Sequence, residues 1–571
     1  MSVFSFSDRY FAFLERRSIG DRWLFMTGVI LAVTGLFVAL IQFNQAKVVA
    51  TPVAGGTLTE GIIGTPRFIN PVLAITRADQ DVVSLVYNGL MKLTADGTLE
   101  PDIAKTITRS DDGRQYTVTL RDNVFFHDGK RLTSQDVVFT INLVQDPNLK
   151  SPLLSDWDGV VTEAVDEQTL TITLREPYAP FIENFTLGIL PAHIWSSIPI
   201  EQIPFSQHNT EPVGSGLYHV DSVTRNPAGL IEAYSLTAST YAQIIPNLET
   251  INLRFFTNEA ELVQALEEKT ITATQSLHPR DAGIDDLIVE EEPMSRTFGV
   301  FYNQNRSPVV RDTSVRQALA AVVNKEDLID TVLGGYGVPT SYPIPDTFIA
   351  TSTPLDVQSS STMSRTQQAE QILIDGGWEQ ADDDSWSKEI DEKTVNLKIT
   401  LQTINTATFE ATAQYLQNAW ESIGIAVEVE QFEQADFIQS VVRPRNFTVL
   451  LFGSDIGRSL DVYPFWHSSQ KDDPGLNITR YTNIEADALL EDIRETDEVE
   501  EREAAAVAFF DILRREQPAL FLYAPTLTYV HHPELHIPNP VARITAPHER
   551  FATIANWNVT TEHLWPLFTN D

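Results

Sequence analysis

Adjacent carboxylates are the first residues of this chain whose type and spacing could do chemistry. Asp111-Asp112 and Asp382-Asp383-Asp384 are two such groups. A glycosidase needs only two carboxyl groups on opposite sides of the bond that it cleaves. With 78 Asp and Glu residues in the chain, however, neighbouring acids arise by chance, and they usually lie on the solvated surface. We interpret these groups as surface charge.

A histidine-rich segment near the end of the chain is a second candidate. His531, His532, Glu534 and His536 carry side chains that suit a metal ion, but their spacing offers no closed coordination set. We interpret them as exposed residues of a polar loop and predict no metal site. The chain has no cysteine, which excludes disulfides, thiol nucleophiles and Cys-ligated metals. It also lacks a P-loop, a dinucleotide fingerprint, H-E-x-x-H and G-x-S-x-G, so we expect no cofactor.

An aromatic cluster is the third candidate. Tyr463, Phe465, Trp466 and His467 lie close together in the sequence. Aromatic faces often line binding pockets, but the same residue types also form core strands and helix ends. The sequence leaves both interpretations open.

Length and charge set the broad class of the protein. The 571 residues are 43% hydrophobic and 21% charged, which indicates a folded protein of several domains. Lys and Arg number 40 against 78 acids, a net charge of -38. A chain this acidic repels polyanions, so nucleic-acid binding is disfavoured.

The segment Trp23–Ile41 carries no charged residue over about 19 positions, which is close to the span of a bilayer core. We predict a transmembrane anchor helix over 23–42, after a cytoplasmic stub at 1–22 and before a tether at 43–54. Basic residues at the front place the N-terminus in the cytoplasm and the bulk of the chain outside the cell membrane. They are Arg9, Arg16, Arg17 and Arg22. A cleaved signal peptide ending at Val48-Val49-Ala50 is the alternative.

Periodicity predicts a mixed α/β architecture for the exported part. Tyr116, Val118 and Leu120 alternate with polar residues, which is typical of a half-buried strand. Thr133-Ser134-Gln135-Asp136 resembles a capping box that opens a helix. A strand over 395–401, a helix over 408–422 and a strand over 425–429 then form a strand–helix–strand unit, so we expect parallel pairing.

Ordered blocks from Gly56 to about Trp557 resemble the family 5 extracellular solute-binding proteins of bacterial ABC importers, which bind oligopeptides, dipeptides or nickel. The strongest block runs from Ser110 to Thr140, with two Asp–Gly turns around a strand and a capped helix. Further blocks that resemble the family are Gly55–Leu58, Phe68–Pro71, Val86–Leu90, Leu99–Ala104, Pro212–Tyr218, Val315–Leu319, Asn477–Tyr481 and Arg502–Tyr523.

This resemblance implies a two-lobed, periplasmic-binding-protein-like fold of type II with an extra inserted domain. Such proteins close on a ligand held between their lobes. By analogy, the first lobe combines 55–85, 212–303 and 530–571, the inserted domain covers 86–211, and the second lobe covers 304–529.

The resemblance also implies ligand-binding residues. Peptide binders of the family hold the ligand's α-ammonium with an aspartate in a W-x-x-D stretch that is followed by Asp-Pro. Here Phe452-Gly453-Ser454-Asp455 takes that place, with Phe instead of Trp, and Asp461-Val462 follows without the proline. Asp455 is thus the expected anchor, Phe452 and Trp466 are candidate pocket walls, and Thr65 is expected at the cleft edge.

The function that this resemblance implies is capture of short peptides and their delivery to the permease subunits of an ABC importer, without enzyme activity. A nickel or metal-chelate binder of the same family is one alternative. A cell-surface hydrolase or an adhesion or scaffold protein is an alternative of another class.

Overall fold

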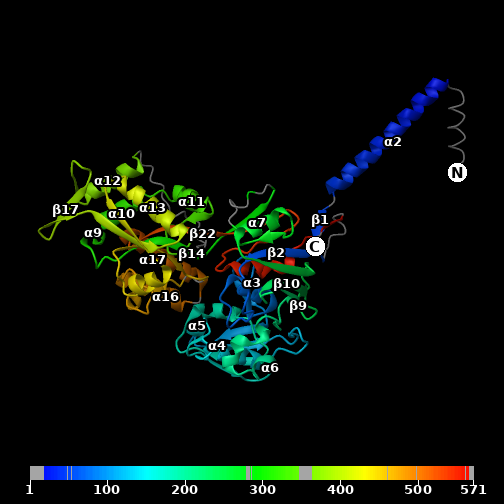
Figure 1. Cartoon of the computed structure of the whole chain (residues 1–571), viewed down its shortest axis with the longest axis horizontal. Helices are drawn as coiled ribbons and strands as arrows, with labels where there is room; N and C mark the ends of the chain where they lie inside the picture. The colour runs from blue at the N-terminus through cyan, green and yellow to red at the C-terminus, as the bar shows by residue number, and fades with distance from the viewer. Residues whose placement is uncertain are drawn as a thin grey trace.

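The structure of the protein, a computed structural model, describes residues 18–47, 49–52, 55–277, 283, 286–345, 363–458, 461–496, 498–559 and 561–564. Two α/β lobes lie side by side, and a smaller domain lies against the first of them (Figure 1). Most of the stub expected at 1–22 falls outside the described residues.

A single large sheet runs through both lobes. Its order is β20-β19-β21-β14-β22-β12-β2-β11-β10-β9, and β13 and β15 also pair with β22. The strands are β2 (Thr57–Ile63), β9 (Tyr218–Arg225), β10 (Ile231–Ala238), β11 (Thr250–Phe256), β12 (Ala273–Thr274), β13 (Ile288–Pro293), β14 (Arg296–Tyr302), β15 (Gly337–Pro339), β19 (Lys398–Ile404), β20 (Ala426–Phe432), β21 (Val449–Asp455) and β22 (Ala519–His531).

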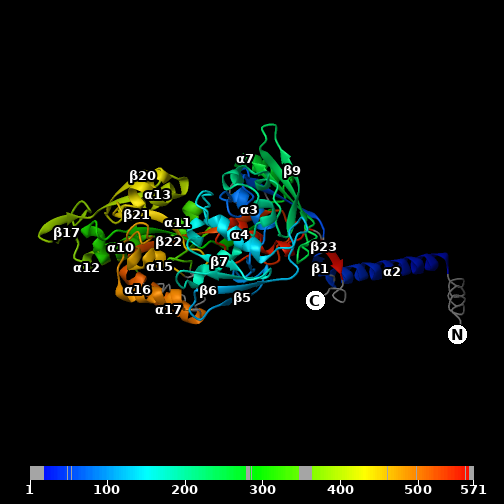
Figure 2. The ribbon, with the colours of Figure 1, turned by 90° about the horizontal axis from the view of Figure 1, so that it is seen from below.

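Strand β22 is the element that the lobes share. Its first half pairs with β14 of the second lobe, and its second half pairs with β13 of the first. Strand β14 also pairs with β21, so it belongs to the second lobe, whereas β13 belongs to the first. The chain therefore passes from the first lobe to the second at Met294–Ser295, and it returns to the first at Pro525–Thr526. Both crossings come earlier than the boundaries expected at 303/304 and 529/530. Figure 2 shows β22 between the two lobes.

The inserted domain is built on a four-stranded antiparallel sheet of order β5-β6-β8-β7. Strand β6 includes the predicted alternation at Tyr116, Val118 and Leu120, whose side chains are buried. Asp136 accepts a hydrogen bond from the Thr133 backbone N–H (2.8 Å), so the predicted capping box is confirmed. The elements are β3 (Met91–Leu93), β4 (Leu99–Pro101), β5 (Ala104–Arg109), β6 (Gln115–Leu120), α4 (Ser134–Gln145), α5 (Leu154–Trp157), β7 (Val161–Ala164), β8 (Thr169–Thr173), η1 (Ala179–Thr186), α6 (Ala192–Trp195), η2 (Ile200–Phe205) and η3 (Gln207–Asn209).

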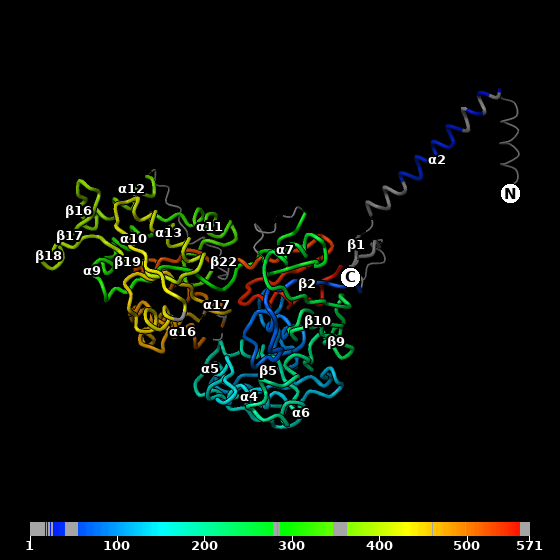
Figure 3. The backbone as a smooth tube through the Cα atoms, in the orientation of Figure 1, coloured from blue at the N-terminus to red at the C-terminus, as the bar shows by residue number. Residues whose placement is uncertain are grey.

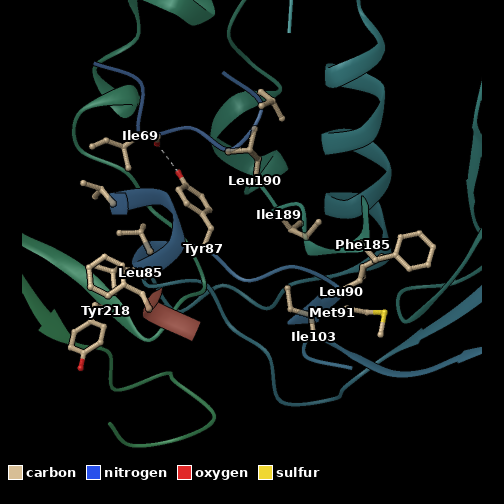
Figure 4. Close-up of a cluster of buried hydrophobic side chains, with 14 of the residues drawn as sticks. Ile69, Leu85, Tyr87, Leu90, Met91, Ile103, Phe185, Ile189, Leu190 and Tyr218 are labelled. Atoms are coloured by element: carbon tan, nitrogen blue, oxygen red, sulfur yellow. Dashed lines mark hydrogen bonds between the residues drawn. The ribbon is translucent and has the colours of Figure 1, made fainter. Parts of the chain in front are cut away.

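One hydrophobic core joins the inserted domain to the first lobe. Leu85 at the end of α3 (Arg77–Val86) belongs to the same buried cluster as Leu90 and Ile189 of the inserted domain (Figure 4). Gly214 packs so closely on this junction that a Cβ there would lie 2.0 Å from the Val86 carbonyl oxygen. The inserted domain is therefore packed as an extension of the first lobe, whose other helices among the described residues are α7 (Glu259–Glu267) and η7 (Pro547–Asn556).

The second lobe contains the predicted strand–helix–strand unit. Strands β19 and β20 pair in parallel on either side of α13 (Ala407–Glu421) in the chain, which confirms the expected pairing. The first strand begins at Lys398, however, because 393–396 form a separate strand of a small antiparallel sheet. The remaining elements are α9 (Pro308–Arg311), α10 (Thr313–Val322), α11 (Lys325–Leu333), α12 (Arg365–Asp375), β16 (Glu379–Gln380), β17 (Trp386–Ile390), β18 (Lys393–Asn396), α14 (Gln434–Asp436), η5 (Phe437–Val442), α15 (Tyr463–Trp466), η6 (Ser468–Gln470), α16 (Ile484–Glu495) and α17 (Val499–Glu516).

Helix α2 (Ile19–Lys47) projects from the body, and the expected anchor at 23–42 lies within it (Figure 1). Over the residues that the structure describes, no helix is both long enough and apolar enough to cross a membrane, so the anchor stays a prediction. Strand β1 (Val49–Pro52), inside the expected tether, pairs antiparallel with β23 (Thr561–Leu564) near the end of the chain. Figure 2 shows β23 beside β1, and Figure 3 shows the backbone of the two lobes with β22 between them.

Candidate functional site

Asp455 is the last residue of β21, where the strand leaves the core of the second lobe. Val449, Leu450 and Leu451 are buried, whereas the Asp455 side chain is 44% exposed. Arg296 lies directly opposite it on β14 and donates a hydrogen bond to its carboxylate (2.9 Å). The carboxylate thus stands at an open strand end, where it accepts hydrogen bonds from the half-exposed Arg296 and from the Gly457 backbone N–H (3.4 Å).

A cavity of about 770 Å³ lies between this strand end and the inserted domain. The second lobe supplies Asp455 and the residues that follow it, and the inserted domain supplies α5 and the segment around η1. The lining residues of this interdomain cavity are Ser155, Asp156, Asp158, Val160, Leu174, Arg175, Glu176, Tyr178, Pro180, Phe181, Glu183, Asn184, Asp455, Ile456, Gly457, Asp461, Pro464, Phe465, Leu476 and Arg494. Six of them are carboxylates and two are arginines, so the cavity favours a positively charged group.

Arg494 closes one side of the interdomain cavity. Its guanidinium lies over the ring of Tyr463 (4.1 Å) and over that of Tyr178 from the inserted domain (5.0 Å). Asp461, whose side chain is 1% exposed, accepts hydrogen bonds from both Nε and Nη2 of this arginine (3.2 Å each). Burial and the nearby Asp461 carboxylate raise the pKa of Tyr178, so its hydroxyl is neutral at physiological pH.

Phe452 and Trp466 have different surroundings. Phe452 is half-buried beside the Phe437 ring (5.9 Å between centroids), and with Asp455 it lines a second cavity of about 520 Å³ inside the second lobe. Trp466 is 2% exposed and packs against Phe301 and Phe521 in the core. The structure therefore brings Phe452 together with Asp455, and it places Trp466 in the hydrophobic interior.

Thr65 lies in the first lobe, in the loop that follows β2. The loop is held by Asp79, whose carboxylate accepts hydrogen bonds from the backbone N–H groups of Arg67 (2.6 Å) and Phe68 (2.8 Å). Thr65 itself is half-buried and lines neither of the described cavities that include Asp455. The structure does not bring it together with the other candidate residues.

The histidine segment differs from the sequence-based interpretation. His531 is 1% exposed and His532 is 6% exposed, so the prediction of an exposed loop is wrong at both positions. They are buried because β22 continues as far as His531, between β12 and β13. Across the described residues, no group of three or more His, Cys, Asp and Glu side chains is arranged to hold a metal ion.

Sequence reasoning missed Arg458, three residues after Asp455. Its guanidinium leaves the second lobe and forms an ion pair with Glu549 of the first lobe (2.5 Å). It lines a third cavity, of about 480 Å³, between the first lobe and the inserted domain. No local pattern in the sequence marks this residue, since its partners lie far away along the chain.

The chain matches the family described as bacterial extracellular solute-binding proteins, family 5 middle, over residues 98–475. It belongs to this family, whose members are extracytoplasmic substrate-binding proteins rather than enzymes.

Named relatives bind different ligands. The chain is 26% identical over 492 residues to the oligopeptide-binding protein AppA of Bacillus subtilis (strain 168), with 84% of this chain and 88% of the relative covered. It is 25% identical over 472 residues to the nickel-binding periplasmic protein of Escherichia coli (strain K12), with 80% and 83% covered.

Solved structures share the fold. AppA from Bacillus subtilis in complex with a nonapeptide has a TM-score of 0.64 at 24% identity, covering 89% of this chain and 100% of that one. NikZ from Campylobacter jejuni in complex with Ni(L-His) has a TM-score of 0.62 at 22% identity, covering 88% and 99%. The likeness to these structures places this chain in the same two-lobed α/β architecture.

Proposed function

We propose that this protein captures short peptides between its lobes and delivers them to the permease subunits of an ABC importer. The observation that carries the proposal is the position of Asp455, a half-exposed carboxylate at a strand end in the wall of the acidic interdomain cavity. A carboxylate there can pair with the α-ammonium of a peptide by a charge-assisted hydrogen bond. The names of relatives that bind oligopeptides and dipeptides support this ligand class.

We further propose that the protein is anchored in the cell membrane by its N-terminal helix, with the two lobes outside the cytoplasm. The anchor rests on the uncharged segment Trp23–Ile41 and on the arginines that precede it. Anchoring keeps a binding protein close to its transporter at high effective concentration. Fractionation tests this part: the full chain should remain in washed membranes, and a chain beginning at residue 51 should be released.

Ligand identity is tested by mass spectrometry of small molecules that the purified full chain releases on denaturation. Short peptides should be released from the parent and depleted in Asp455→Asn. Asp472→Asn is the matched control, because Asp472 is also an exposed carboxylate of the second lobe paired with an arginine (2.9 Å to Arg480). Equal release from all three proteins would overturn the role of Asp455.

A nickel chelate is the second candidate, because one relative and one similar structure are named for nickel binding. The same experiment separates the two ligands. A metal chelate in the released material, without peptide, would overturn the peptide proposal and leave the family unchanged. If the protein released no small molecule and bound no member of a peptide library, a scaffold or adhesion role would be favoured.

A further inference from the structure

Arg458 ties the loop after the candidate ammonium site to the rest of the molecule. Its guanidinium donates to the Glu549 carboxylate (2.5 Å), to the Arg543 carbonyl oxygen (2.9 Å) and to the Gly97 carbonyl oxygen (3.4 Å). Its backbone N–H donates to Glu183 of the inserted domain (3.4 Å). One residue of the second lobe therefore contacts both other parts of the protein.

The partner of Arg458 is held rigidly. The Glu549 carboxylate also accepts hydrogen bonds from the backbone N–H (2.7 Å) and the hydroxyl (2.6 Å) of Thr545, which precedes the N-cap residue of η7. The side chains of Arg458 and Glu549 are 12% and 15% exposed. Burial alone would raise the pKa of Glu549, but the Arg458 charge and the Thr545 hydrogen bonds outweigh it and hold the pKa below its usual value. The pair is therefore ionised and mostly shielded from solvent.

The contact is adjacent to the proposed ligand site along the chain and in space. Asp455 and Gly457 line the interdomain cavity, and Arg458, the next residue in the chain, lines the neighbouring cavity. The two cavities share a wall, because Asp156, Glu183 and Asn184 line both. Moving Arg458 away from Glu549 would thus move the strand end that carries Asp455 away from the inserted domain.

We propose that Arg458 is a positioning residue of the ligand site: its ion pair with Glu549 holds the Asp455 strand end against the inserted domain and so favours the ligand-binding arrangement of the lobes. This inference rests on the proposed function, since it concerns the same site. The proposal predicts that the ion pair of Arg458 and Glu549 changes the affinity for the ligand although neither residue contacts the ligand. Such couplings typically change affinity by about 5- to 150-fold.

The experiment measures lobe geometry and ligand affinity separately, in the full chain. The protein has no cysteine, so spin labels at Glu267→Cys on α7 and Glu410→Cys on α13 report the distance between the lobes. Arg458→Ala and Glu549→Gln should broaden this distance distribution in the ligand-free protein. Arg458→Lys, which keeps the charge, should broaden it less. Lys398→Ala is the control, because it removes an ion pair (2.9 Å to Glu428) that lies within the second lobe.

Affinity is measured by calorimetry with tetra-alanine as the probe peptide. Arg458→Ala should weaken binding about tenfold, with Lys398→Ala within about twofold of the parent. An unchanged distance distribution in both Arg458→Ala and Glu549→Gln would overturn the inference, and so would tighter binding by Arg458→Ala. A broadened distribution in a protein that binds no peptide would support the positioning role and count against the peptide proposal. Far-ultraviolet circular dichroism confirms that each variant is folded.

Discussion

The backbone N–H of Met294 donates a hydrogen bond to the carbonyl oxygen of Pro525 (3.0 Å), at the level where both crossover strands pass between the lobes. The two crossings are thus neighbours in space although they are far apart in the chain. The adjacent residue, Ser295, donates its N–H to the carbonyl oxygen of Ile544 (3.0 Å). Because two adjacent strands connect the lobes, a rotation about this level changes few backbone torsions.

Hydrogen exchange tests whether the lobes rotate about the level of Met294 and Ser295. Binding of tetra-alanine should change amide exchange at Met294 and Ser295, because their hydrogen bonds lie where the strands cross. Exchange at Val300 and Phe301, in the middle of β14, should stay the same because β14 is paired there with β21 and β22 inside the second lobe. Exchange that changes equally along the whole of β14 would show that the lobes do not rotate about this level.

Acetylation of the α-amino group of tetra-alanine tests whether Asp455 pairs with the α-ammonium of a peptide. An acetylated α-amino group carries no charge, so the parent protein should bind it about 10- to 100-fold more weakly than the free peptide. Asp455→Asn should bind both peptides with similar weak affinity, because the carboxylate that distinguishes them is gone. Calorimetry of the four combinations gives the interaction between ammonium and carboxylate directly. If Asp455→Asn still discriminated strongly between the peptides, another residue would be the anchor.

Protonation of His127 should make the stability of the protein depend on pH. Burial lowers its pKa to about 4, and its Nδ1 accepts a hydrogen bond from the Gly214 N–H (3.3 Å), which requires the neutral ring. The ordinary pKa of histidine is about 6.5, so between these values the unfolded chain binds a proton that the folded chain does not. The free energy of unfolding should therefore fall as pH drops from 6.5 to 4, by up to about 3 kcal/mol.

The measurement is urea unfolding of the parent and His127→Gln at several pH values from 7 to 4. Other groups also titrate in this range, so the decisive quantity is the difference between the two slopes. The variant should lose less stability over the window than the parent. Parallel curves would show that His127 is protonated in the folded protein as easily as in the unfolded one.

Substitution of Arg550 should cause a large loss of stability. It donates to Asp81 (2.7 and 2.9 Å) and to Glu60 (2.5 Å), and both carboxylates are fully buried. Arg550→Met should lower the free energy of unfolding by about 3–5 kcal/mol, because it removes the cation that donates hydrogen bonds to both buried carboxylates. Since burial already raises the pKa of Glu60, the loss should be smaller at acidic pH, where this group can be protonated.

Denaturant unfolding at pH 7 and pH 5 checks this expectation. Arg515→Met is the control, because the Arg515 side chain is 64% exposed and its loss should change stability by no more than about 0.5 kcal/mol. A loss below about 1 kcal/mol for Arg550→Met would mean that the two carboxylates are satisfied by other groups or by water.

Local periodicity in the sequence is sufficient to predict several elements. The alternation at Tyr116, Val118 and Leu120 and the capping residue Thr133 depend on near neighbours only, and both were found where expected. The parallel pairing of β19 and β20 also follows from a local order of strand, helix and strand. The order of short motifs along the chain predicted the family, since these motifs build the turns and capped helices of its fold.

Only the tertiary structure showed which distant segments of the chain contact one another. His531 and His532 look like a polar loop in the sequence, yet they are buried because strands from elsewhere in the chain pair with β22. Trp466 and Phe452 are both aromatic residues near Asp455, but of these two only Phe452 lines one of the described cavities with it. The ion pair of Arg458 and Glu549 joins residues 91 positions apart, a separation at which sequence periodicity carries no information about contact.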